Sequence, residues 1–236
     1  MRIASIVILV ALAAQAAAAS PITIGGFTFS DGEAAFADDA FLVSGTIRFT
    51  CATAGAGPAG SVAEALSGSD LEHCVNNNTG NSGVVEAIFL DNSIENAPGV
   101  DLVIFELSGA LTTGTPEPRE NFGVSIGLPS GFSPFAYFNP IATGTNSCGD
   151  PALCLDTFAV EIDLSDFGVA FGALVERVRL HIFDVGLGTK SGDVAALGAI
   201  HSAPPVPEPG TGLLTLGGLA VLRIVRRSRR DAVRWC

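Results

Sequence analysis

The chain has 236 residues, of which 48% are hydrophobic and only 15% are charged, and its formal net charge is −12 at pH 7. This apolar composition predicts a folded domain with a real core and excludes a disordered acidic segment. The excess of acidic residues argues against nucleic-acid binding, which needs a basic surface, and disfavours binding to anionic lipid.

Residues 1–19 have the pattern of a secretory signal peptide. Arg2 supplies a short charged region, residues 3–14 are apolar, and three alanines at 17–19 offer a cleavage site before Ser20. The apolar stretch is too short to predict a spanning helix. We therefore expect residues 1–19 to be removed on export, which leaves residues 20–203 as the ectodomain.

Short runs of β-branched and aromatic residues predict strands throughout the ectodomain. In chain order, the expected strands are 22–29, 41–51, 84–90, 102–107, 122–128, 158–164, 175–183 and 194–200. The sequence Ser69-Asp70-Leu71-Glu72 has capping-box spacing, which predicts one short helical turn near Cys74. We expect an all-β fold, specifically an antiparallel β-sandwich of the jelly-roll type.

The predicted ectodomain is more acidic than the whole chain. Without the leader and the C-terminal tail it keeps five basic and 23 acidic residues, a net charge of −18. This charge is compatible with divalent cations, with cationic polymers or with simple solubility.

Four cysteines lie in the predicted exported part, where disulfides persist: Cys51, Cys74, Cys148 and Cys154. Of the three possible pairings we favour Cys51–Cys74 and Cys148–Cys154, because each bond would close a loop between predicted strands. A zinc site is the alternative. It has weak support, because there is no Cys-x-x-Cys pair and only His73 is nearby.

Residues 123–127 match Gly-x-Ser-x-Gly, the pattern of a hydrolase nucleophile elbow, with Asp156 and His181 following Ser125 in a suitable order. That chemistry needs a tight turn from a strand into a helix, and no helical pattern follows residue 127. We therefore interpret Ser125 as a strand residue and predict no catalytic site. A serine hydrolase that uses Ser125 is the alternative.

Carboxylates at strand ends are the best metal ligands that the sequence offers. The three histidines have no ligand spacing, and no Asp-x-Asp-x-Asp-Gly loop is present. We predict no cofactor and no metal site, and we interpret the acidic pairs as solvated carboxylates. Structural calcium, which takes six to eight oxygen ligands, is the alternative, with Asp38, Asp39 and Asp193 as candidates.

A Pro-containing loop at 131–140 holds four aromatic residues, Phe132, Phe135, Tyr137 and Phe138. Most phenylalanines of the ectodomain fall at strand positions and are expected in the core. We favour a role for these four in capping one end of the sandwich. The alternative is an exposed patch that binds a ligand such as a glycan.

The C-terminus reads Pro207-Glu208-Pro209 at the end of a Pro-rich linker (204–209), followed by an apolar segment (210–225) and a basic end (226–236). An apolar segment closed by cations is a membrane stop signal whose cationic end stays in the cytoplasm. Its arginines are Arg223, Arg226, Arg227, Arg229 and Arg230. A helix over 210–225 would be about 24 Å long, shorter than the roughly 30 Å hydrocarbon core, which suits a transient anchor.

These three parts, in this order at the C-terminus, resemble the PEP-CTERM sorting tail of Gram-negative bacteria, which is also labelled the ice-binding protein C-terminal domain. Segments 101–106 and 192–200 also resemble strands of PEP-CTERM ectodomains. The resemblance implies a transient stay in the inner membrane, cleavage by an exosortase, and delivery to the cell surface or extracellular matrix. An ordinary membrane anchor after a Pro-rich linker is the alternative.

This resemblance implies an exported protein with a structural or adhesive role in the surface layer or the extracellular polysaccharide matrix. It carries over no catalytic residue and no ice binding. A glycan- or calcium-binding module is the alternative function.

Overall fold

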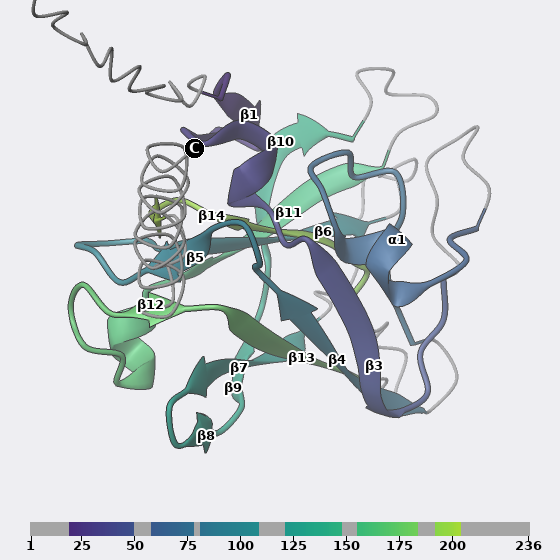
Figure 1. Ribbon diagram of the computed structural model, residues 1–236. Coiled ribbons are helices and arrows are strands. Elements are labelled where there is room, and N and C mark those ends of the chain that lie inside the picture. Colours follow the sequence, from purple (N-terminus) through teal and green to yellow (C-terminus); the bar gives the residue numbers. More distant parts are fainter. Residues whose placement is uncertain are drawn as a thin grey trace, which may run out of the picture.

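The computed structural model describes residues 19–49, 58–77, 81–108, 121–147, 155–183 and 192–203. These residues form antiparallel sheets with almost no helix (Figure 1). The predicted all-β, antiparallel class is confirmed. The predicted signal peptide up to residue 18, and the linker, apolar segment and basic tail from residue 204, lie outside the described residues.

Two larger sheets make up most of the fold. One contains β3 (Asp39–Gly45), β4 (Ser82–Ile88), β13 (Arg177–Phe183), β7 (Phe122–Leu128) and β8 (Gly131–Phe132) in that order, with β9 (Ala136–Phe138) also paired to β7. We call it the β13 sheet. The other, the β6 sheet, contains β10 (Ile141–Asn146), β11 (Asp156–Ile162), β6 (Leu102–Ser108) and β14 (Val194–Ala199).

Smaller elements complete the described part of the chain. A three-stranded sheet joins β12 (Leu174–Val175), β5 (Ser93–Glu95) and β15 (Ser202–Ala203), and β1 (Ile22–Ile24) forms a hairpin with β2 (Phe27–Phe29). The helical elements are α1 (Val62–Leu66) and two 3-10 turns, η1 (Gly32–Ala35) and η2 (Leu164–Phe167).

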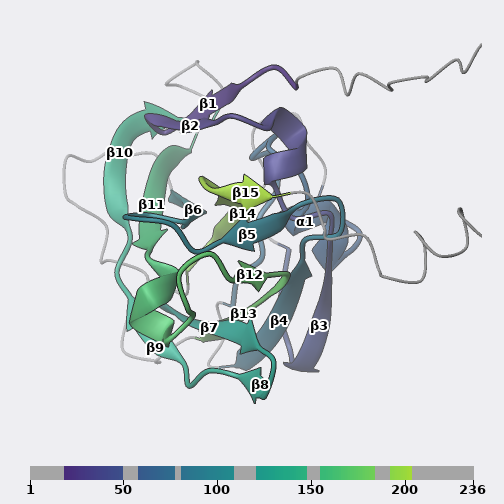
Figure 2. The same ribbon diagram turned by 60° about the vertical axis from the view of Figure 1, so that its left-hand side comes forward.

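The main hydrophobic core lies between the two larger sheets (Figures 1 and 2). Strand β13 shows why: Val178, Leu180 and Ile182 are fully buried, while the residues between them point to the opposite face. Residues of β4 and β7 join them from the same sheet, and Leu102 and Ile104 of β6 join from the facing sheet. The alternation predicted around His181 is thus confirmed.

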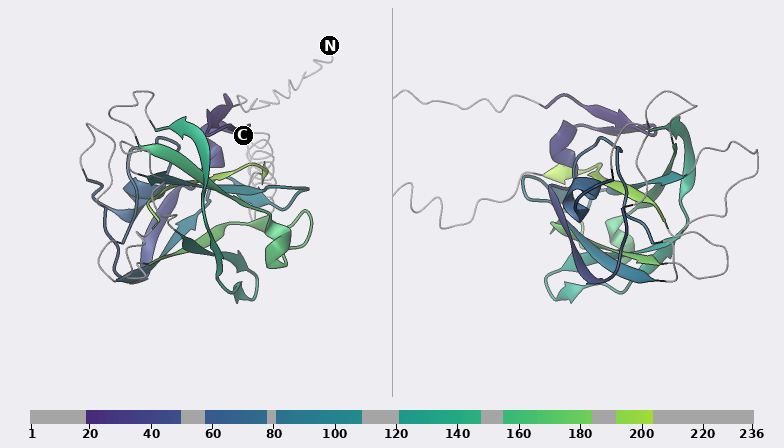
Figure 3. Two further views of the ribbon diagram at one scale, coloured as in Figure 1. Left: turned by 180° about the vertical axis from the view of Figure 1, so that it is seen from behind. Right: turned by 90° about the vertical axis from the view of Figure 1, so that its right-hand side faces the viewer.

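A second core lies on the other face of the β6 sheet. Every residue of β6 is buried, because the β1–β2 hairpin and η1 cover the face turned away from the β13 sheet (Figures 2 and 3). Phe29 packs at 4.7 Å from Phe36 and at 6.0 Å from Phe105, measured between ring centroids. Gly198 lies beneath them, and a Cβ there would come within 2.5 Å of the Phe29 ring. Strands β6 and β14, at the centre of this packing, are therefore buried on both faces.

The predicted helical turn at 69–72 is wrong. Leu71 has a φ of 51°, and the Asp70 carboxylate accepts a hydrogen bond from the Glu72 N–H, so side-chain bonding replaces helix here. The helix begins earlier. Ser61 accepts from the Glu64 N–H, and Glu64 accepts from the Gly60 N–H, so a capping arrangement starts α1.

Among the described residues, no helix has the length and apolar character needed to cross a membrane. The predicted spanning segment, 210–225, is outside them.

Candidate functional site

The face of the β13 sheet that is turned away from the main core carries the best candidate site. Strand β13 presents four side chains there, Arg177, Arg179, His181 and Phe183, each at least partly exposed. Because a strand advances by about 3.3 Å per residue, these side chains form a stripe roughly 20 Å long. We call it the β13 face.

Aromatic rings surround His181 at one end of the β13 face. The His181 ring lies 5.5 Å from Phe135, 6.1 Å from Tyr137 and 5.0 Å from Phe183, between centroids. Tyr137 is 54% exposed, and its hydroxyl oxygen lies 3.2 Å from His181 Nδ1. These four residues form a partly exposed cluster of flat side chains, which we call the aromatic cluster.

Gly123 makes room for this cluster. It lies opposite both His181 and Tyr137 in the sheet register. A Cβ at this position would lie 2.9 Å from the Tyr137 ring, 3.2 Å from His181 Cβ and 3.3 Å from the Phe135 ring. The glycine therefore allows rings from two strands and a loop to lie across the backbone of β7.

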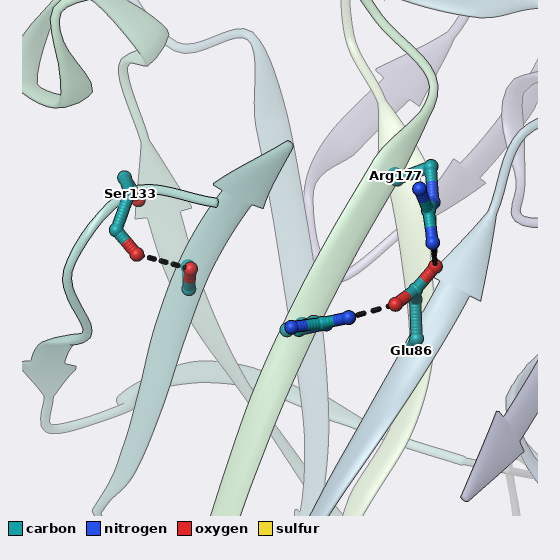
Figure 4. A network of polar contacts seen from close by, with 5 residues as sticks. Glu86, Ser133 and Arg177 are labelled. Carbon is teal, nitrogen blue, oxygen red and sulfur yellow. Dashed lines mark hydrogen bonds and ion pairs between the residues drawn. The ribbon is translucent and has the colours of Figure 1, made fainter. Parts of the chain in front are cut away.

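An ionic group occupies the other end of the β13 face (Figure 4). Glu86 of β4 is fully buried; its Oε1 accepts from Arg177 Nε at 2.5 Å, and its Oε2 accepts from Arg179 Nε at 2.8 Å. The Arg179 guanidinium also lies over the Phe132 ring, 3.7 Å from its centroid. The group contains two cations and one anion, so it carries one net positive charge.

The four aromatic residues that we expected to cap the sandwich, or alternatively to form a ligand patch, do not stay together. Phe135 and Tyr137 belong to the aromatic cluster, and Phe132 lies under Arg179. Phe138 instead packs against the main core, with its ring 6.3 Å from Phe167. The loop thus supplies both a capping residue and surface aromatics.

Ser125 lies within the uninterrupted strand β7, without a turn into a helix. Its hydroxyl is buried and donates to the Ser133 carbonyl at 2.6 Å (Figure 4). The Ser133 hydroxyl accepts from the Ile126 N–H. Asp156 is on β11 of the other sheet, and His181 bonds to Tyr137. The structure therefore does not assemble Ser125, Asp156 and His181 as a triad.

The calcium candidates are not brought together either. The Asp38 carboxylate accepts from the N–H groups of Leu90 and Asp91 after β4, and Asp39 accepts from its own neighbour's N–H. Asp193 instead comes just before the start of β14. Phe36, two residues before Asp38, pairs with Gly198 near the other end of that strand. Within the described ranges, no group of three His, Cys, Asp or Glu side chains is placed to hold a metal ion.

Asp91 is affected by its proximity to Asp38. Partial burial, and then the negative charge and hydrogen bonding of Asp38, raise the pKa of the Asp91 carboxyl above its usual value. Two carboxyl groups alone do not make a metal site, and we assign no ligand here.

Cys74 is the one cysteine within the described residues, so no disulfide joins two described cysteines. It is fully buried and is disulfide-bonded. Cys51, Cys148 and Cys154 lie outside the described residues, and the predicted pairings stay predictions. The same is true of the sorting motif, Pro207-Glu208-Pro209, and of the arginines from Arg223 to Arg230.

Sequence reasoning missed the partners of the aromatic loop. The signal was present in the alternation of β13, where Arg177, Arg179, His181 and Phe183 occupy every second position. Only the register of β13 with β4 and β7 shows that Glu86 and Tyr137 lie beside this stripe.

No family model matches the chain, and no curated protein matches it. The β13 face is therefore interpreted from its own geometry.

His181 is predicted to stay neutral until the solution is more acidic than its ordinary pKa of 6.5, because burial lowers its pKa. As the pH falls below 6.5, the unfolded chain binds more protons than the folded chain, so the protein loses stability until the folded-state pKa is passed. NMR titration of the His181 ring should give a pKa below 6.5. A His181→Gln protein should lack this part of the pH dependence, and a measured pKa at or above 6.5 would contradict it.

Proposed function

We propose that this chain is an exported protein of the bacterial cell surface or extracellular matrix, where it has a structural or adhesive role. In this proposal the leader directs export, the PEP-CTERM-like tail holds the chain briefly in the inner membrane, and an exosortase-type enzyme cleaves near Pro209. The acidic ectodomain and the order of the C-terminal parts support it. We propose no enzymatic activity.

The β13 face is the observation that carries the adhesive role. An exposed tyrosine and three partly exposed rings beside it form a surface for flat, weakly polar ligands. Sugar rings have such faces, and aromatic side chains stack against them. We propose that the chain adheres to extracellular polysaccharide through the β13 face, which also favours the glycan-binding module among the alternative functions.

The finer fold prediction belongs to the same proposal. We propose that the two larger sheets form a β-sandwich of jelly-roll type, and that Cys51–Cys74 and Cys148–Cys154 are its disulfides. The shared core between the sheets supports the sandwich, and the buried position of Cys74 supports a role for that residue in the fold interior.

The test is to measure the intact mass of the protein in each cell fraction of the native host. We expect a species that begins at Ser20 and ends near Pro209, enriched in the extracellular polymer fraction. A matched variant with Pro207, Glu208 and Pro209 replaced by alanine should keep its arginine tail and remain in the inner membrane. Unprocessed wild-type protein that ends at Cys236, or protein found only in the periplasm, would refute the sorting proposal.

A further inference from the structure

Basic side chains are scarce in the described residues and concentrated on one face. The only three are Arg48, Arg177 and Arg179. Arg48 lies outside the sheets, in an isolated bridge with Asn76. The other two are neighbours on the β13 face of a chain whose overall charge is −12. Among the described residues, the β13 face is therefore where an anionic ligand finds two neighbouring cations.

The two arginines of the β13 face have different roles. Arg179 has 29% of its side chain exposed and is held between Glu86 and the ring of Phe132. Arg177 has 51% of its side chain exposed; its Nε and Nη2 approach the same Glu86 oxygen, and its guanidinium lies farther from the Phe132 ring, 5.2 Å from the centroid. A guanidinium has five N–H donors, so the outer edge of Arg177 keeps donors for a ligand. Glu86 thus orients Arg177 without covering it.

The exposed cation and the aromatic cluster lie on one stripe. Arg179 separates Arg177 from His181, and each step between alternate residues of a strand is about 6.7 Å. A polymer lying along β13 can therefore stack a sugar ring on Tyr137 and place an acidic group on Arg177. Guanidinium groups bind carboxylates through two parallel hydrogen bonds, which gives this contact geometric preference as well as charge.

From this juxtaposition we propose that the ligand of the β13 face is an acidic polysaccharide, bound through ring stacking on the aromatic cluster and through a carboxylate on Arg177. The inference rests on the proposed function and narrows it from polysaccharide in general to the uronic-acid class.

The test measures binding of the full chain, purified in detergent, to polygalacturonate and to fully methyl-esterified polygalacturonate. The two polymers share a backbone and differ in charge. We expect saturable binding to the acid that is at least tenfold tighter than binding to the ester and that weakens with added salt.

Variants locate the contact. Arg177→Gln should weaken binding to the acid at least tenfold and leave binding to the ester unchanged, while Arg179 still pairs with Glu86. Arg177→Lys keeps the charge and should retain part of the preference. Tyr137→Ala should weaken binding to both polymers. Arg48→Gln is the matched control and should bind as the original protein does. A thermal melt of each variant checks that it is folded.

Three outcomes would overturn the inference: equal binding to acid and ester, no binding to either polymer, or equally tight binding of polyglutamate, which would show that charge alone is recognised. Equal binding to acid and ester leaves the adhesive function standing. Failure of that function is separate, because it would appear as absence of the protein from the polymer fraction of the native host.

Discussion

Replacing Phe105 with alanine is expected to lower the free energy of unfolding by about 3–5 kcal/mol. Phe105 is fully buried at the centre of β6, where its ring lies 6.1 Å from Phe27 and 6.0 Å from Phe29. The hairpin that carries these two rings is a separate two-stranded sheet, in which β1 pairs only with β2, through three residue pairs. Its attachment therefore depends on packing, and loss of Phe105 leaves a cavity beneath it.

Urea unfolding, monitored by far-UV circular dichroism, would measure this loss of stability. Phe171→Ala is the matched control, because Phe171 is 77% exposed and its removal should change stability by less than about 0.5 kcal/mol. Phe105→Leu should fall between the two, since leucine refills part of the cavity. Equal stability of the Phe105→Ala and Phe171→Ala proteins would mean that the second core contributes little.

Much of this fold could be predicted from the sequence, because long, buried strands have a recognisable pattern of β-branched and aromatic residues. The segment 122–128 coincides with β7, and the other predicted strands all overlap strands of the structure. The boundaries shifted where glycine changes the backbone. Gly25 and Gly26 both have positive φ and divide the expected strand 22–29 into the β1–β2 hairpin, and Gly45, also with positive φ, ends β3 before the expected limit.

The missed strands are short or exposed. β5, β8, β9 and β15 contain two or three residues each, and their pairing is set by the sheets around them rather than by their own patterns. β10 is longer, but it is an edge strand that reads Ile-Ala-Thr-Gly-Thr-Asn, with a bulge between Ala142 and Thr145. The bulge interrupts the alternation of side chains, so periodicity could not identify β10 as a strand.

The candidate site was predictable in part, from local composition and from the alternation of one strand. The aromatic loop at 131–140 stood out by composition, and the outward direction of His181 followed from alternation. The neighbours of these residues did not follow, because Glu86 is 91 positions from Arg177 in the chain and meets it only through the β4–β13 register. Pairing register between distant strands is a tertiary property that local pattern does not encode.

Replacing Asp101 with alanine is the second change with a large expected effect, a loss of about 2–5 kcal/mol in the free energy of unfolding. Asp101 is fully buried immediately before β6, and its carboxylate links two loops. Oδ1 accepts from the Ala97 N–H at 2.8 Å, and Oδ2 accepts from the Leu164 N–H at 2.9 Å. Without the carboxylate, the buried Leu164 N–H and the partly buried Ala97 N–H both lose their partner.

The Asp101→Asn protein separates hydrogen bonding from packing. Asparagine has nearly the same shape, but only one of its two terminal atoms accepts, so one of the two N–H groups would face another donor. We expect a loss that approaches that of alanine despite the conserved volume. Glu161→Ala, on the exposed side of β11, is the control and should be nearly neutral. If Asp101→Asn were as stable as the original protein, the side-chain bonds to Ala97 and Leu164 would not hold these loops. Backbone hydrogen bonds and apolar packing would then fix the ends of β5 and β11.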